Sequence, residues 1–71
     1  MRGTLAVKNS QDTDLKIVLE PWADEFLLSP GKTIEVTFSG PVDGRLEVES
    51  QTGAIIVWGW EGSVLSAQIK Q

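Results

Sequence analysis

The sequence predicts an all-β domain, a small antiparallel β-sandwich or partly open barrel of six to seven short strands. Three observations favour this class: apolar and polar residues alternate over short stretches, turn residues separate the stretches at regular intervals, and no long helical pattern interrupts them. A chain of 71 residues has room for one hydrophobic core. We therefore expect a single β domain over residues 1–71.

The first part of the chain contains two predicted strands. Residues 4–8 alternate around Leu5 and Val7, and the polar residues 9–13 form a turn. Residues 14–20 follow, and Pro21 ends this strand because proline has no N–H to donate to a neighbouring strand. The apolar residues of the second strand share one face, namely Leu15, Ile17 and Leu19. Residues 22–28 are the one place where we expect a short helical turn, since Trp22 and Phe26 are four positions apart.

The second part repeats the pattern. Residues 29–32, with the sequence SPGK, form a turn, and the strand after it directs Ile34, Val36 and Phe38 inward. A turn at 40–44 leads to a strand over 45–50, for which we expect Leu46 and Val48 to point inward. Residues 54–60 are apolar on both faces, which is typical of a central strand. A last turn at 61–63 leads into the strand 64–70.

Two registers are open for the last predicted hairpin, and they decide which residues are buried. A two-residue loop of Glu61 and Gly62 places Trp58 opposite Leu65 on the core face. A loop that also includes Ser63 instead buries Ile55, Val57, Leu65, Ala67 and Ile69. Because a buried tryptophan removes about 150–250 Å² from water, we expect Trp58 in the core. The position of Trp60, beside the turn, is left open.

Four residues form the one surface site that the sequence nominates for a ligand or partner: Trp22, Asp24, Glu25 and Trp60. Trp22 lies in a connection, and we expect it to cover one open end of the sandwich. The alternative is that Trp22 anchors a ligand or partner, since exposed aromatic residues are typical of binding hot spots.

Charge and composition exclude several kinds of function. The net charge is −4, from six Lys and Arg against ten Asp and Glu, and the cations are scattered. We therefore expect no binding to nucleic acids or to anionic membranes. The absence of cysteine and histidine argues against disulfides and zinc, so no cofactor or metal is expected. The N-terminus lacks the apolar run of a signal peptide, and we expect a cytoplasmic location.

No catalytic or ligand motif is complete in the sequence. Gly31-Lys32-Thr33 matches the end of a phosphate-binding loop, but Phe26 occupies the position of the required first glycine. The loop aspartates do not complete a calcium-binding pattern, and no nucleophile has a histidine partner. We therefore expect that the protein is not an enzyme. Glu35, Glu47 and Glu49 are expected on the outward faces of adjacent strands, as a solvated surface.

Residues 19–36, LEPWADEFLLSPGKTIEV, resemble a segment of small, uncharacterised bacterial β-sandwich proteins, in which Glu-Pro-Trp leads to a Pro-Gly turn and a strand. The Pro-Gly turn before an alternating strand also resembles cupredoxin-like and immunoglobulin-like domains. The cysteine and histidine ligands of a copper site are absent here. The resemblance therefore implies a sandwich and transfers no activity.

Two functions remain as expectations. The first is a non-catalytic protein-interaction module that binds a protein partner or forms a homo-oligomer, through an exposed strand edge or a tryptophan-bearing surface. The second is a module that binds a small ligand. Carbohydrate is the ligand that the tryptophans favour, because exposed indole rings stack on sugar rings.

Overall fold

The computed structural model describes residues 1–70 and has seven strands and no helix among them. Within this range, no helix is therefore long and apolar enough to cross a membrane. The strands are β1 (Arg2–Lys8), β2 (Leu15–Glu20), β3 (Asp24–Leu28), β4 (Thr33–Ser39), β5 (Glu47–Gln51), β6 (Ala54–Trp58) and β7 (Val64–Lys70).

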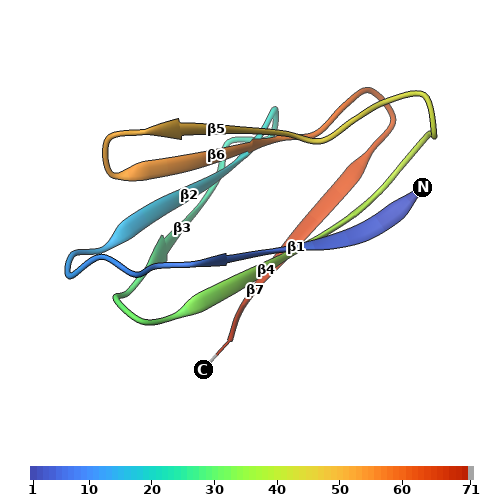
Figure 1. Cartoon of the computed structure of the whole chain (residues 1–71). Helices are drawn as coiled ribbons and strands as arrows, with labels where there is room; N and C mark the ends of the chain where they lie inside the picture. Colours follow the sequence, from blue (N-terminus) through green and yellow to red (C-terminus); the bar gives the residue numbers. More distant parts are fainter. Residues whose placement is uncertain (71) are drawn as a thin grey trace.

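The strands form two sheets that pack as a sandwich (Figure 1). One sheet has three strands in the order β1-β4-β7, and the other has four in the order β3-β2-β6-β5. All neighbouring strands are antiparallel except β2 and β6, which run parallel. The predicted all-β sandwich is therefore confirmed, and the sheets do not close into a barrel.

The core lies between the two sheets and follows the alternation of the sequence. Ile34 and Val36 of β4 face Ile17 and Leu19 of β2, and all four are almost completely buried. Further buried members of this cluster are Leu15, Leu28, Val57 and Leu65. Burial of aliphatic side chains of this kind stabilises a fold by about 1.5–3 kcal/mol each.

The expected helical turn at residues 22–28 is wrong, because residues 24–28 form the strand β3. Phe26 pairs with Ile17 and Leu28 with Leu15 of β2. This pairing sends both side chains toward the core, where Leu28 is fully buried and Phe26 packs against the buried cluster. The four-residue spacing of Trp22 and Phe26 therefore did not indicate a helix.

The expected hairpin between residues 54–60 and 64–70 is also wrong, because β6 and β7 belong to different sheets. β6 lies between β2 and β5, which confirms that this apolar stretch is a central strand. β7 pairs with β4, with Leu65 opposite Phe38. The turn at 61–63 thus connects the two sheets. Because β6 and β7 do not pair, neither of the two hairpin registers is formed.

Trp58 lies outside the core, contrary to the expectation. Val57 is fully buried, so its neighbour in the strand points to the opposite face, and Trp58 is 39% exposed. The expected inward direction of Val48 holds, since Val48 pairs with the buried Val57, but Val48 remains 50% exposed because β5 is an edge strand. Leu46 packs against the core, as expected.

Loops meet at both ends of the sandwich. At one end, which we call the N-terminal end, Met1 bonds to Gly40 of the loop 40–46, and the loops 20–23 and 59–63 are joined by the bond from Gly59 to Glu20 (Figure 1). At the opposite end, the buried Asn9 joins the loop after β1 to the turn before β4. Its Nδ2 donates to the carbonyl oxygens of Thr13 and Leu28, each at 2.8 Å, and its Oδ1 accepts the N–H of Gln11 at 2.9 Å.

Candidate functional site

Trp60 closes the N-terminal end of the sandwich. Its ring meets Phe38 edge to face, with the centroids 6.2 Å apart and the planes at 71°. Its Nε1 donates to the carbonyl oxygen of Pro41 at 3.0 Å, and its backbone N–H donates to Oγ of Ser63 at 2.9 Å. Trp60 is thus held in place on three sides and is only partly exposed.

Gly44 and Gly40 make room for the Trp60 ring. A Cβ atom on Gly44 would lie 1.7 Å from Cδ1 of Trp60, and a Cβ atom on Gly40 would lie 2.9 Å from its Cζ2. A side chain at position 44 would therefore displace the indole. The sequence pattern predicted that both glycines lie in a turn. It did not predict that they pack against the ring of Trp60, which is far away in the sequence.

Trp22 lies at the same end and contacts the chain beside Gly59. A Cβ atom on Gly59 would lie 3.0 Å from Cη2 of Trp22. The loop that carries Trp22 is fixed by two bonds to Glu20, whose Oε1 accepts the N–H of Ala23 at 3.1 Å and whose carbonyl oxygen accepts the N–H of Gly59 at 2.8 Å. Trp22 thus covers part of this end and remains 43% exposed.

The two acidic residues of the nominated site differ in position: Asp24 pairs with Leu19, directly after the loop that carries Trp22, and Glu25 lies on the opposite face. Asp24 and Glu25 begin β3, and successive residues of a strand point to opposite faces. Glu25 pairs with Val18 on the outer face of the four-stranded sheet, where its Oε1 lies 3.9 Å from Nζ of Lys16. The structure therefore brings Trp22 and Trp60 to one end of the sandwich and places Glu25 on the outer face of a sheet.

A surface hollow of about 600 Å³ lies beside Trp60 and is open to solvent. It is lined by Pro41, Asp43, Gly44, Trp60, Glu61 and Gly62. The lining combines one indole with two carboxylates. Among the described residues, no three acidic side chains are placed so that they could hold a metal ion.

The outer face of the four-stranded sheet carries an apolar group that sequence reasoning missed. Val18 of β2 pairs with Ile56 of β6, and the next outward position on β6 is Trp58. Val18 is 9% exposed, yet neither it nor Ile56 belongs to the core cluster or packs against it. Neighbours on the outside of the sandwich therefore cover Val18 and part of Ile56, whereas Trp58 remains exposed.

Glutamates flank this apolar group on both sides. In one row across the sheet, Glu25 and Glu49 lie at the two ends of the Val18–Ile56 pair. In the next row, Glu20 and Glu47 are the neighbours of Trp58. We call this surface the Trp58 face; it comprises Val18, Ile56, Trp58, Glu20, Glu25, Glu47 and Glu49.

The outer faces of the two sheets differ in charge. The four-stranded sheet directs four glutamates and one lysine, Lys16, outward. The three-stranded sheet directs Arg2, Lys8 and Lys70 outward with one carboxylate, that of Glu35. The expectation that Glu35, Glu47 and Glu49 share adjacent strands is therefore wrong, because β4 and β5 lie in different layers.

Hydrogen bonds fix Glu49 beside Trp58. Its Oε1 accepts the indole Nε1–H of Trp58 at 3.0 Å, and its Oε2 accepts Nε2–H of Gln51 at 3.0 Å. Both bonds stabilise the charged carboxylate, the bond from Gln51 more than the bond from Trp58. Together they hold the pKa of Glu49 below its usual range. Glu49 thus stays ionised and oriented at the edge of the Trp58 face.

Comparisons with protein-family models, with curated proteins and with solved structures found no match to this chain. The candidate site therefore rests on the geometry of the molecule. Two surfaces stand out in that geometry: the Trp58 face and the hollow beside Trp60.

Proposed function

We propose that the protein is a non-catalytic interaction module and that its Trp58 face binds an extended, positively charged segment of a partner protein. The observation that carries this proposal is the apolar group of Val18, Ile56 and Trp58 with glutamates on both sides. An apolar side chain of the partner would cover the group, and flanking Lys or Arg side chains would meet the carboxylates.

The chemistry of the surface favours such a partner in two ways. Tryptophan is enriched among the residues that contribute most to protein interfaces, and a cation over an indole ring gains about 0.5–2 kcal/mol. Four carboxylates around one aromatic residue also attract a cationic segment before contact, which raises the association rate. A second acidic face would be repelled, so two copies are not expected to meet through this surface.

The carboxylates that flank Trp58 differ in how they are held. Glu49 is fixed by two hydrogen bonds, so it loses little freedom when a partner binds. Glu47 has no hydrogen-bond or ion-pair partner within residues 1–70 and can accept a new one. Glu47 is therefore the residue at which a change should weaken binding with the smallest effect on the free protein.

Carbohydrate binding is the second candidate, and the hollow beside Trp60 is the observation that favours it. One indole and the carboxylates of Asp43 and Glu61 provide an apolar surface and acceptors for hydroxyl groups. Trp60 already donates its Nε1–H to Pro41, and its ring is partly covered, so a small area remains for stacking.

An amide-shift titration by NMR tests both candidates. The probes are acetyl-Arg-Leu-Arg-Leu-Arg-amide, its counterpart with Glu in place of Arg, and maltoheptaose. We expect the cationic peptide to shift resonances of β2, β5 and β6, with weaker binding at higher salt. Glu47→Gln should reduce this affinity, and the matched change Glu61→Gln in the loop should leave it unaltered.

Three results would overturn the proposal. The first is equal binding of both peptides, and the second is an equal effect of the two glutamine variants. The third is a response to maltoheptaose alone, around residues 41–44 and 60–62, which would favour the carbohydrate candidate.

A further inference from the structure

We propose that a second copy of this chain pairs with the free edge of β7 in antiparallel orientation and extends the three-stranded sheet across a two-fold axis. The resulting sheet would have the order β1-β4-β7 followed by β7-β4-β1 of the second copy. This inference does not depend on the Trp58 face, which belongs to the other sheet.

The sandwich has four edge strands, and their charges differ. β1 carries Arg2 and Lys8, β3 carries Asp24 and Glu25, and β5 carries Glu47 and Glu49. β7 has seven residues, of which Lys70 at its end is the one charged residue. Proteins protect edge strands with charges and with short length, because an uncharged long edge pairs readily with another chain. β7 is as long as β1 and longer than β3 and β5, and it carries fewer charged residues than any of the other three, so it is the least protected edge.

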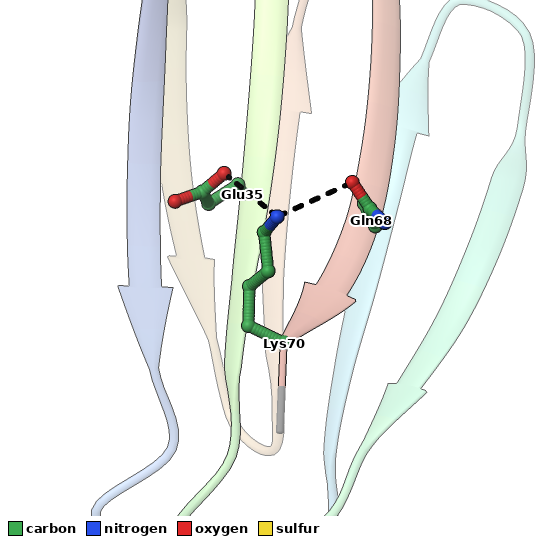
Figure 2. Close-up of polar contacts among 3 residues, drawn as sticks. All are labelled: Glu35, Gln68 and Lys70. Atoms are coloured by element: carbon green, nitrogen blue, oxygen red, sulfur yellow. Dashed lines mark hydrogen bonds and ion pairs between the residues drawn. The ribbon is translucent and has the colours of Figure 1, made fainter.

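The charge of Lys70 is turned away from that edge (Figure 2). Its Nζ lies 3.6 Å from Oε1 of Glu35 and 3.4 Å from Oε1 of Gln68. Glu35 belongs to β4, which pairs with β7 on the side opposite to the free edge. The ammonium group is thus held over the sheet, and the free edge of β7 meets no charge of its own strand.

Antiparallel pairing of β7 with itself is two-fold symmetric when it is centred on Ala67. It places Val64 opposite Lys70, Leu65 opposite Ile69, and Ser66 opposite Gln68 of the second copy. No two like charges meet, and the pairing covers Val64 and Ile69, which are 64% and 37% exposed. Leu65 and Ile69 share the inner face of the sheet, so this pairing also lengthens the core.

The same construction fails at two of the other edges. β1 centred on Leu5 places Arg2 opposite Lys8 at both ends of the pairing. β5 centred on Glu49 places that carboxylate against its own copy. Like charges directly opposite each other destabilise a strand pair. The charge pattern thus favours a second copy at β7 over a second copy at β1 or β5.

Sedimentation velocity from micromolar to millimolar protein tests this inference with a matched pair of variants. Ser66→Lys adds a cation near the centre of β7. In the dimer this lysine lies opposite Gln68 of the second copy, and its diagonal neighbours there are two cations, the substituted residue 66 and Lys70. Thr4→Lys adds the same charge to the same outer face on β1. We expect the first variant to raise the dimer dissociation constant by about tenfold or more and the second to leave it unchanged.

Disulfide trapping gives an independent readout, because the chain has no cysteine of its own. Ala67→Cys should form a covalent dimer rapidly on oxidation, since the two sulfur atoms face each other across the axis. Ala6→Cys on β1 is the control and should stay largely monomeric. A wild-type protein that remains monomeric at millimolar concentration would overturn the inference. Dimerisation that survives Ser66→Lys, or that Thr4→Lys abolishes, would also contradict it, and neither result would bear on the Trp58 face.

Discussion

At the scale of single residues, Asn9 shows how one polar side chain can hold two loops together. It is 1% exposed, and all its side-chain hydrogen-bonding groups are used. Its backbone N–H also donates to Lys32, and its carbonyl oxygen accepts the N–H of Gly31. The sequence placed Asn9 in a polar turn, where asparagine is common, and gave no sign that it would be buried.

Asn9→Ala should lower the free energy of unfolding by about 2–3 kcal/mol, because it leaves the buried carbonyl oxygen of Leu28, the part-buried one of Thr13 and one N–H without their partner. Urea denaturation followed by tryptophan fluorescence measures the change. Ser10→Ala, at the exposed neighbouring position, is the control and should have a negligible effect. An equal stability of the two variants would show that Asn9 does not hold the loops.

Glu49 makes the stability of the folded protein depend on pH. Its pKa is depressed in the folded protein, first by the bond from Gln51 and second by the bond from Trp58. The contribution of these bonds to stability is therefore complete above the pKa of the unfolded chain and is lost as the pH falls through the lower, folded pKa.

Gln51→Leu and Trp58→Phe should each raise the pKa of Glu49, and Gln51→Leu should raise it more. Carboxyl carbon shifts measured by NMR against pH report this pKa directly. Gln11 lies in the exposed loop after β1 and makes no bond to Glu49, so Gln11→Leu should leave the pKa of Glu49 unchanged. If neither of the first two variants moves the titration of Glu49, the hydrogen bonds do not set its pKa.

At the scale of strands and turns, the hairpin between β5 and β6 depends on one backbone angle. Gln51 pairs with Ala54, and Gly53 in the loop between them has a φ of +74°. No atom lies within 4 Å of the position that a Cβ atom on Gly53 would take. A side chain would therefore meet free space, and the left-handed backbone alone restricts this position.

Gly53→Ala should cost about 1 kcal/mol of stability, since alanine is strained at positive φ. Gly53→Asn should cost less, because asparagine tolerates this conformation better. The urea midpoint of each variant measures the cost. An alanine variant as stable as the wild type would mean that the turn adopts another conformation in solution.

The alternation of the sequence was sufficient to predict most strands and the inward faces of β2 and β4. Ile17, Leu19, Ile34 and Val36 were all identified correctly. β3 was missed because a five-residue strand after a tight turn carries little periodicity, and the spacing of Trp22 and Phe26 is equally compatible with a helix. Residues 24–28 form a strand because they pair with β2, and a local sequence pattern does not contain this pairing.

The site was harder to predict than the fold. β6 is apolar on both faces, so its pattern does not show which side is buried, and the energetic preference for burying Trp58 was wrong. Val57 and Ile55 fill the core instead. The parallel pairing of β2 and β6, which brings Val18 beside Ile56, joins segments far apart in the sequence. No local signal predicts it.

At the scale of the whole molecule, the two outer faces carry opposite charge and different chemistry. The four-stranded sheet presents an aromatic and aliphatic group among carboxylates, and the three-stranded sheet presents mainly polar residues with three cations. A net charge of −4 conceals this separation. Trp58 is therefore exposed to solvent in an acidic environment.

Collisional quenching of single-tryptophan proteins tests this claim most directly. A protein with Trp22→Phe and Trp60→Phe reports on Trp58 alone, and one with Trp22→Phe and Trp58→Phe reports on Trp60. Each is titrated with caesium and with iodide, and both quenchers are normalised to free N-acetyl-tryptophanamide. We expect caesium to quench Trp58 at least about twofold better than iodide at low salt, because the glutamates concentrate cations there. Trp60 is only partly exposed and should be quenched by caesium less than Trp58. Equal quenching of Trp58 by the two ions would show that no acidic surface surrounds it, and no quenching by either would show that it is buried.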